Sequence, residues 1–536
     1  MQMELVTDIL RHSLFRLTSP PFLLFLLVMT VVYYSVPKKH QWKVLLAGNA
    51  LFIGLYAGIM SVWQFALPLA VYLAASLIIY SVPIIIQRAG AERKKRAALI
   101  AGIACLSLLF VLFRLANSFI LTINGFLPDG WRLSPISFSW IAPVGIAYFL
   151  LSGIGYIVDV YWEKYPAERS FARVALIAGF FPALVSGPIV RYDKISESFF
   201  TPHSFDYQKF KFGAERVIYG FFKKLVIADR ASAVTGALFG NPETTAVPYI
   251  FGLFLFALQL YSDFSGCMDI MLGTAEILQI ELPENFRRPF LARNLSEFWR
   301  RWHITLGLWA KDYIMYPLLK SKPFFELGVW CRKKFGRKLG KTIPSYVAML
   351  ALWIIIGLWH GGAPKYVFSS GILLWITIVG GQLLQPAFDK LSGFLRINRK
   401  SGAYGIFCNF RTLCLMCFAW LFFSADTLTS GAKAFIRIIR TFPGDLIHIG
   451  ASAGHIIAAF KSAGYNLYDI LILMFGFAVL LTVGILTEKM GFNVRQKLQD
   501  TNIAVEWFVL FFFIFFVIIF GIYGPGYNVA DFIYNL

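Results

Sequence analysis

The chain has 536 residues, of which 58% are hydrophobic, 17% aromatic and only 15% charged. A soluble domain usually carries about 25% charged residues, so this composition excludes a soluble protein. Many apolar stretches reach the roughly 20 residues that cross a bilayer as a helix, and they lack the alternating polarity of a membrane barrel. The chain is therefore predicted to be an all-α polytopic membrane protein.

Basic residues account for the net charge of +21, and many of them lie in short segments between apolar stretches. Residues 37–43, 87–97 and 320–341 are three such segments. Cytoplasmic loops next to an anionic leaflet have this pattern. We therefore expect these segments to face the cytoplasm and the N-terminus to lie outside. The partner of the positive charge is then the lipid bilayer, and no nucleic acid is expected.

Twelve apolar stretches are predicted to span the membrane. In chain order they are residues 22–37, 44–62, 65–86, 98–122, 138–160, 171–190, 247–262, 344–361, 366–385, 405–424, 466–488 and 505–525. The chain begins with a polar, amphipathic segment, and its first apolar stretch is too long for a cleavable signal. The sequence has no evident internal repeat and no soluble segment of useful size. Residues 1–536 are therefore predicted to be a single integral membrane domain.

Between residues 200 and 343 apolar and charged stretches alternate too closely for regular membrane crossings. The segment FKFGAERVIYGFFKKLVIAD, which ends at Asp229, is typical of an interfacial or re-entrant helix. Upstream, Pro182, Gly187 and Pro188 interrupt another apolar stretch, which suits either a cavity wall or an ordinary kinked span. Irregular backbone at membrane depth is tolerated only inside protein or beside a wet cavity. We therefore expect a cavity in the middle of the chain.

Two carboxylates, Asp263 and Asp269, lie in the apolar stretch LYSDFSGCMDI. Buried carboxylates need positively charged partners. The candidate partners are the arginines at positions 287, 288, 293, 300 and 301. Asp263 is accordingly predicted to line the cavity.

The stretch NLSEFWRRWHITLGLW collects ionisable groups among tryptophans. His303 follows Arg300, Arg301 and Trp302, and Asp312 lies nine residues further along. Ionisable groups are costly inside a bilayer and usually serve a function there, and the arginines could hold an anion. The alternative is that His303 is an interfacial residue at the level of the lipid headgroups.

His360 follows an uninterrupted apolar stretch that ends in Trp359, and it precedes Gly361 and Gly362. Two glycines allow another chain or a ligand to approach the backbone closely. A neutral imidazole in a partly dry site is a common general base near neutral pH. The alternative is a histidine that merely interacts with the dipole at the C-terminus of a helix.

Other catalytic motifs are missing from the sequence. It has no glycine-rich phosphate loop, no G-x-S-x-G elbow and no HExxH pair. Its six cysteines do not form a zinc set with histidines. No metal site is predicted, and any chemistry is expected to depend on histidine.

The segment ENFRRPFLARNLSEFWRRWHITLGLWAKDYIMYPL, followed by GLWHGG at 357–362, resembles the membrane-bound O-acyltransferase (MBOAT) family. The stretches GIAYFLLSGIGYIVDVYW, FFPALVSGPIVRY, LQLYSDFSGCMDIMLG and FAWLFFSADTLTSGAKAF also agree. The resemblance spans roughly residues 140–440. Within the family the chain is similar to the bacterial branch that includes the alginate O-acetylation membrane protein. It departs from that branch after YPL, where a long basic segment replaces a glycine-rich turn.

The resemblance implies a multi-helix bundle around a central tunnel, with re-entrant or interfacial helices. It suggests N-terminal helices at 1–140, a catalytic core at 141–440 and C-terminal helices at 441–536. The catalytic histidine of the family's WHG motif corresponds to His360, and the tunnel histidine of its RWH motif corresponds to His303. The side chains expected to line the tunnel or contact the substrate are Trp302, Trp359, Arg300, Arg301, Asp263 and Asp312.

The resemblance also implies the reaction. An acetyl group would pass from a cytoplasmic thioester, acetyl-CoA or another acyl donor, across the bacterial cell membrane to an extracytoplasmic polysaccharide. No bound cofactor is expected, and the expected protein partner is an extracytoplasmic SGNH-type acetyltransferase. An imidazole can take the proton of the attacking hydroxyl, while a second histidine or an arginine stabilises the oxyanion.

Two alternatives remain open at this point. Transfer of D-alanine to teichoic acid uses similar FW-x-RWH and WHG-like motifs in the same family. A membrane transporter or flippase could also place histidines and charges at mid-membrane, although transporters often show inverted repeats and this sequence shows none.

Overall fold

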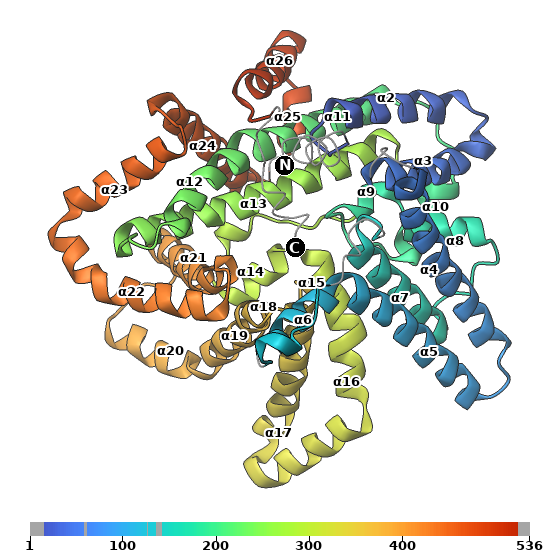
Figure 1. Ribbon diagram of the computed structural model, residues 1–536, viewed down its shortest axis with the longest axis horizontal. Coiled ribbons are helices and arrows are strands. Elements are labelled where there is room, and N and C mark those ends of the chain that lie inside the picture. Colours follow the sequence, from blue (N-terminus) through green and yellow to red (C-terminus); the bar gives the residue numbers. More distant parts are fainter. Residues whose placement is uncertain (1–14, 58–61, 126, 136–141, 492, 524–536) are drawn as a thin grey trace. The chain divides into compact units, whose positions relative to one another are not determined.

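A computed structural model describes residues 15–57, 62–125, 127–135, 142–491 and 493–523. In this part of the chain every regular element is a helix, apart from an isolated bridge between Phe286 and Trp302. Figure 1 shows these helices in chain order, from α2 in blue to α26 in red. The predicted all-α fold is confirmed.

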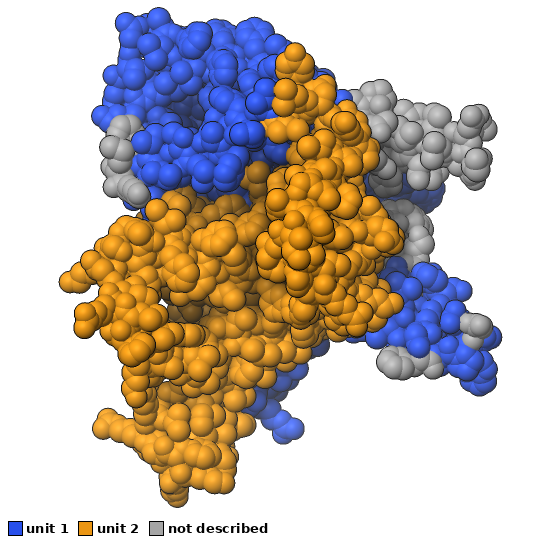
Figure 2. Space-filling view, turned by 90° about the vertical axis from the view of Figure 1, so that its left-hand side faces the viewer, with its two compact units in different colours: residues 1–230, 259–284, 471–536 blue, residues 231–258, 285–470 orange. Residues whose placement is uncertain are grey.

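The chain forms two compact units, which Figure 2 shows in blue and orange. Unit 1 contains residues 1–230, 259–284 and 471–536, and unit 2 contains residues 231–258 and 285–470. Each unit therefore combines segments that are distant in the sequence. The functional division suggested at residues 140 and 440 stays a prediction.

Unit 1 contains most of the N-terminal helices and the last helices of the chain. They are α2 (Pro20–Ser35), η1 (Lys38–His40), α3 (Gln41–Ala57), α4 (Val62–Arg88), α5 (Glu92–Phe110), η2 (Val111–Leu115), α6 (Ala116–Asn124), η3 (Asp129–Trp131), α7 (Ile146–Tyr161), α8 (Phe171–Ala178), α9 (Phe181–Leu184), α10 (Tyr192–Phe200), α11 (Tyr207–Phe221), η4 (Phe222–Ala228), most of α24 (Leu467–Met490), α25 (Val494–Gln499) and α26 (Ile503–Phe520).

Unit 2 contains the helices between these two groups. They are η5 (Pro289–Leu291), α14 (Leu295–Arg301), α15 (Ile304–Ala310), η6 (Lys311–Met315), α16 (Tyr316–Lys320), α17 (Lys322–Trp359), α18 (Pro364–Tyr366), η7 (Val367–Ile372), α19 (Leu373–Leu383), α20 (Gln385–Phe394), α21 (Gly402–Ser424), α22 (Leu428–Ile447) and α23 (Ile449–Ser462). Helices α12 (Asp229–Gly240) and α13 (Ala246–Ile277) contribute residues to both units.

Eight helical segments of the described chain are long and apolar enough to cross a membrane. They are Val62–Arg88, Glu92–Asn124, Ala246–Ile277, Lys322–Trp359, Pro364–Leu383, Gly402–Ser424, Leu467–Glu488 and Ile503–Phe520. Each overlaps a predicted span. The predicted spans 22–37 and 138–160 correspond to shorter apolar helices, Pro20–Ser35 and Ile146–Tyr161. The chain is thus a multi-pass membrane protein.

The predicted span 171–190 is wrong as a single helix. Helix α8 ends at Ala178, the short α9 ends at Leu184, and the residues after it are not helical. A broken segment was one of the two expectations for the prolines and glycine there. Gly145 permits this arrangement, because its φ is +68° and a Cβ atom would lie 2.1 Å from the Leu184 carbonyl oxygen.

The basic segment 320–341 is largely helical, so its description as a loop is wrong. It forms the first part of α17, which is interrupted at Gly336, where φ is 84° and ψ is 172°. A Cβ atom on Gly340 would lie 2.6 Å from Cα of Arg332, so the two arms fold back on each other. Figure 1 shows this sharp bend in α17, in yellow.

Four glycines bring α11 and α13 into close contact in unit 1. A Cβ atom on Gly213 would lie 2.7 Å from the Gly273 carbonyl oxygen, and one on Gly220 would lie 2.7 Å from the Gly266 carbonyl oxygen. In each helix the two glycines are seven residues apart, about two helical turns. Small residues let membrane helices approach closely. This contact brings η4, which follows α11, next to the carboxylates of α13.

In unit 2 a similar contact fixes the C-terminal end of α17. A Cβ atom on Gly357 would lie 2.8 Å from Cα of Val367 and 2.9 Å from the carbonyl oxygen of Tyr366. Helix α17 therefore packs against η7 with almost no space between the two backbones. The residues that follow Trp359 are held close to η7 as a result.

Candidate active site

His303 lies at a sharp turn between two short helices of unit 2. Helix α14 is capped by Asn294, whose side chain accepts a hydrogen bond from the Glu297 backbone N–H. At the other end of α14, the Arg287 N–H donates to the Arg301 carbonyl oxygen over 2.8 Å. His303 then adopts a left-handed conformation, with φ 47° and ψ 51°. A non-glycine residue in this region is uncommon and often marks a functional site.

Asn285 holds this turn from the preceding segment. Its carbonyl oxygen accepts from the Ile304 N–H over 3.0 Å. Its side-chain Oδ1 accepts from the N–H and the hydroxyl of Thr305, each over 3.0 Å. Its Nδ2 lies 3.3 Å from Nδ1 of His303. One fully buried side chain therefore fixes both the start of α15 and the ring of His303.

His360 caps the C-terminus of α17, and its N–H donates to the Ile356 carbonyl oxygen over 3.1 Å. Gly361 and Gly362 follow with φ of +136° and +73°, conformations that glycine adopts most readily. The imidazole of His360 lies among aromatic rings. Its centroid is 5.6 Å from that of Phe423 and 6.5 Å from that of Tyr366.

The Trp359 indole brings the two histidines together. Its ring centroid is 5.6 Å from that of His303 and 5.1 Å from that of His360, both edge to face. His303 and His360, 57 residues apart in the sequence, thus contact the same side chain. The structure therefore brings together the three site residues predicted from the RWH and WHG motifs. Their catalytic roles stay predictions.

Burial keeps His303 neutral. Only 3% of its surface is exposed, and this desolvation, with a smaller effect of His360, lowers the pKa of His303 well below its usual value. A neutral imidazole has one nitrogen that donates a hydrogen bond and one that accepts. The site can therefore accept a proton or stabilise a negative oxygen without a permanent charge.

Trp302 directly precedes His303 in the chain and packs in a cluster of aromatic side chains. It stacks on Phe298 at a centroid distance of 5.5 Å and contacts Phe286 at 5.0 Å and Trp420 at 5.6 Å. Aromatic side chains of this size exclude water from the surrounding site. Through these contacts Trp302 supports the turn that carries His303.

Arg300, Arg301 and Asp312 lie near this turn in the chain, with different surroundings. Arg301 forms an ion pair of 2.7 Å with Glu297, one turn earlier in α14. Arg300 is exposed, and Asp312 is half-buried in η6. The pairing with Glu297 indicates that Arg301 stabilises α14. Anion binding by the two arginines stays a prediction, as does a tunnel-lining position for all three residues.

Asp263 lies in unit 1, whereas both histidines lie in unit 2. Its partner is Lys224, at 2.7 Å. Asp269 pairs with Lys223 at 2.5 Å and with Arg216 at 2.9 Å. The expectation that the arginines at 287–301 are the partners is therefore wrong. Lysines that follow α11 in the chain reach these carboxylates instead, because the glycine contact brings η4 next to α13.

Sequence reasoning missed Asn285 and the lysines of η4 as site or core residues. Asn285 lies within the segment that resembles the family, but an asparagine carries no chemistry that a spacing argument detects. Lys223 and Lys224 lie in a segment predicted to be interfacial, yet each is only 3% exposed. The seven-residue glycine spacing in both α11 and α13 was the available signal for this contact.

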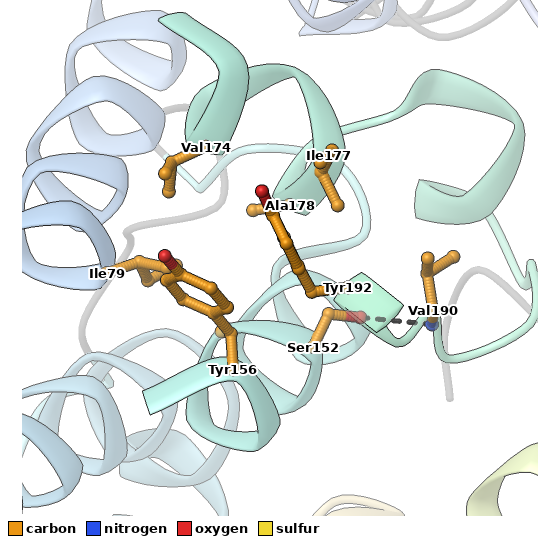
Figure 3. Close-up of a pocket in the computed structure, with 9 residues that line it drawn as sticks. Ile79, Ser152, Tyr156, Val174, Ile177, Ala178, Val190 and Tyr192 are labelled. Atoms are coloured by element: carbon orange, nitrogen blue, oxygen red, sulfur yellow. Dashed lines mark hydrogen bonds between the residues drawn. The ribbon is translucent and has the colours of Figure 1, made fainter. Parts of the chain in front are cut away.

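Unit 1 contains a small pocket whose lining includes none of these site residues (Figure 3). It is lined by Ile79, Ser152, Gly153, Tyr156, Val174, Ile177, Ala178, Val190 and Tyr192. The Ser152 hydroxyl accepts a hydrogen bond from the Val190 N–H over 3.2 Å. The lining is mostly apolar and contains no histidine or carboxylate, so it supports packing rather than catalysis.

The described helices are those of a multi-pass membrane protein, with two histidines around one half-buried tryptophan. Residues 138–328 match the family described as MBOAT, membrane-bound O-acyltransferase. Residues 138–328 are therefore of the MBOAT type, and the chain is an acyltransferase. The enzyme reading is thereby preferred over the transporter alternative.

Several bacterial proteins of named activity are similar over most of their length. The probable alginate O-acetylase AlgI of Pseudomonas syringae pv. tomato is 28% identical over 76% of this chain and 71% of its own. The peptidoglycan O-acetyltransferase of Helicobacter pylori is 26% identical over 84% of this chain and 85% of its own. The teichoic acid D-alanyltransferase of Bacillus subtilis is 25% identical over 53% of this chain and 69% of its own.

Proposed function

We propose that this acyltransferase moves an acetyl group from a cytoplasmic thioester, acetyl-CoA or another acyl donor, across the bacterial cell membrane. The final acceptor is a hydroxyl of an extracytoplasmic polysaccharide. The observation that carries the proposal is the placement of His303 and His360 against the same tryptophan, with ring centroids 5.6 and 5.1 Å from that of Trp359.

The chemistry assigned to this pair is acyl transfer from sulfur to oxygen. His360 takes the proton of the acceptor hydroxyl as the oxygen attacks the thioester carbonyl carbon. The carbonyl oxygen becomes an oxyanion, which a hydrogen bond from His303 stabilises. The carbon–sulfur bond then breaks, the proton passes from His360 to the thiolate, and an ester and a free thiol result.

Aromatic packing around the pair supports this assignment. Trp359 contacts both imidazoles, while Phe423 and Tyr366 contact His360. A thioester is open to hydrolysis, so a site that excludes water protects the donor. A tunnel joining the two membrane faces is part of the proposal, as are Arg300 and Asp312 as substrate contacts.

Relatives named as O-acetylases or O-acetyltransferases support acetyl as the transferred group. The Pseudomonas syringae and Helicobacter pylori proteins cover 76% and 84% of this chain, compared with 53% for the Bacillus subtilis D-alanyltransferase. D-Alanyl transfer is therefore the second candidate. We further propose that an SGNH-type acetyltransferase outside the membrane takes the acetyl group and passes it to the polymer.

Replacement of His360 tests the catalytic assignment. Membranes that contain the His360→Ala variant should lose acetyl transfer by about a hundredfold or more, because the acceptor hydroxyl loses its base. The measurement is transfer of radiolabelled acetyl from acetyl-CoA at matched protein levels, with D-alanyl thioester as the competing donor. His455→Ala, at an exposed position of α23, is the control. Activity of His360→Ala close to that of the control would contradict the assignment.

Cysteine labelling tests the orientation of the chain in the membrane, on which the direction of transfer depends. Cysteines at Lys39, Arg93 and Lys338, all exposed positions, should resist an impermeant thiol reagent in intact cells and react after permeabilisation. This follows from the cytoplasmic location of the basic segments and the external N-terminus; residues 1–14 lie outside the described part of the chain. Labelling of the Lys338 position from outside would overturn the orientation.

A further inference from the structure

Asn285 contacts His303 in a way that determines which ring nitrogen carries the proton. The side chain of Asn285 is fully buried, with 0% exposed surface. Its amide faces one ring nitrogen of the imidazole, with Nδ2 at 3.3 Å and Oδ1 at 3.4 Å from Nδ1 of His303. The distances alone allow Nδ1 either to accept or to donate, so the orientation of the amide must decide.

Thr305 fixes the orientation of the amide. Its backbone N–H donates to Oδ1 of Asn285 over 3.0 Å, and its hydroxyl donates to the same oxygen over 3.0 Å. A backbone N–H cannot accept a hydrogen bond. A rotated amide would place the NH₂ group against this N–H, and two donors would face each other. The oxygen therefore faces Thr305, and its two lone pairs are both used.

The amide nitrogen is left as the group that bonds the imidazole. Nδ2 donates to Nδ1 of His303, so Nδ1 is an acceptor and has no proton. A neutral imidazole carries one proton, which must then be on Nε2. Burial favours the neutral form of this histidine, because it lowers the pKa of His303.

We propose that Asn285 is a positioning residue that holds His303 in the tautomer protonated on Nε2, so that His303 acts only as a hydrogen-bond donor toward the substrate. As far as the substrate is concerned, this inference rests on the proposed function. His303 then donates from Nε2 to the oxyanion and cannot serve as the base. The proton of the acceptor hydroxyl goes to His360.

The backbone of Asn285 supports the same arrangement. Its carbonyl oxygen accepts from the Ile304 N–H over 3.0 Å, which ties the left-handed turn at His303 to the segment before α14. Both the position and the tautomer of the imidazole thus depend on one residue, 18 positions earlier in the chain. A loose imidazole would exchange its proton between nitrogens and lose its fixed direction.

Nuclear magnetic resonance measures the tautomer without any activity assay. The full-length protein, labelled with ¹³C,¹⁵N-histidine in lipid bilayers, gives the His303 signals by difference from the His303→Gln variant. Nε2 is bonded to Cδ2, whereas Nδ1 is bonded to Cγ. The protonated nitrogen of His303 should correlate with Cδ2. A protonated nitrogen that correlates with Cγ would overturn the proposal.

Substitution of Asn285 then tests the cause. Asn285→Asp replaces the NH₂ donor with an acceptor of the same shape, so Nδ1 of His303 should become protonated. Asn285→Ala should lower kcat by roughly 100-fold, the scale of a misplaced catalytic group, with a smaller change in KM for the acyl donor. Asn398→Ala, at an exposed position of unit 2, is the matched control and should keep the wild-type kcat.

The outcomes separate this inference from the proposed function. Absence of acyl transfer by the wild-type protein would contradict the proposed function, while the tautomer of His303 would still be measured. An Asn285→Asp variant that keeps Nδ1 without a proton would contradict the role of Asn285, even in an active enzyme. Loss of folded protein in both Asn285 variants leaves the wild-type spectrum as the deciding measurement.

Discussion

The two units each contain a buried polar region, and the two regions differ in how they are satisfied. In unit 1, a charged cluster consists of Arg216, Lys223, Lys224, Asp229, Asp263 and Asp269. Its ion pairs are 2.5 to 2.9 Å long. In unit 2, the histidine site consists of Asn285, His303, Trp359 and His360. It has a neutral amide, two imidazoles and aromatic neighbours.

This difference indicates that the polar groups of unit 1 stabilise the fold, whereas those of unit 2 suit catalysis. A buried charge is costly unless an opposite charge and hydrogen bonds compensate it, and each lysine of the charged cluster has such a partner. Removal of one partner should therefore affect folding. The histidine site has no ion pair among its four members, so substitution of His303 or His360 should affect catalysis and leave the fold largely intact.

The largest expected effect is on the stability of unit 1. Asp269→Ala leaves Lys223 without its carboxylate and Arg216 with only Glu284. Removal of one partner of a buried ion pair typically costs about 3–5 kcal/mol. We expect a lower yield of folded protein and a lower unfolding temperature, measured by heating the purified protein in detergent.

Glu284→Gln is the matched control for this prediction. Glu284 also pairs with Arg216, at 2.7 Å, but its side chain is 59% exposed. Exposed ion pairs contribute only about 0–1 kcal/mol, so this variant should unfold close to the wild-type temperature. Equal unfolding temperatures for Asp269→Ala and Glu284→Gln would show that the charged cluster is not a major source of stability.

The next effect concerns the two histidines. His303→Ala removes one hydrogen-bond donor to the oxyanion, a loss of about 2–4 kcal/mol in transition-state stabilisation, so residual transfer should remain measurable. His360→Ala should leave essentially none. The double variant should resemble His360→Ala, because residues that act in one step are not additive.

Acetyl transfer by the two single variants and the double variant is compared at matched levels of protein in the membrane. Wild-type-like activity of His303→Ala would return that histidine to the interfacial alternative.

The smallest effect is the dependence of stability on pH, and the two units should differ in its sign. The folded pKa of His303 lies well below its ordinary value of 6.5. Below pH 6.5 the unfolded chain therefore binds a proton that the folded chain does not, and stability falls as the pH falls. One group contributes at most about 1.4 kcal/mol per pH unit.

Glu215 in unit 1 should act in the opposite direction. Burial raises the pKa of its carboxyl from 4.5 to about 7. The folded chain keeps this proton where the unfolded chain loses it, so stability falls as the pH rises from about 4.5 to 7. Unfolding temperatures measured between pH 4.5 and 7.5 should change slope in His303→Gln and, with opposite sign, in Glu215→Gln. Unchanged slopes in both variants would contradict these assignments.

The sequence by itself determined the class of the protein and the two histidines worth examining. Apolar length, charge placement and the RWH and WHG motifs are local properties, and they are readable without knowledge of packing. All eight long apolar helices in the described part of the chain overlap a predicted span for this reason. The predictions for 171–190 and 321–341 were wrong because glycine and proline allow several backbone conformations there. Contacts with other parts of the chain select one of these conformations.

Only the tertiary structure decided which side chains meet. Asp263 pairs with Lys224 rather than with a downstream arginine, because paired glycines let α11 and α13 approach closely. His303 meets Trp359 and Asn285 because a left-handed turn and a buried amide fix its ring. Such contacts join residues that are 18 to 56 positions apart. They depend on the separation of backbones in space, which residue types and spacing alone do not specify.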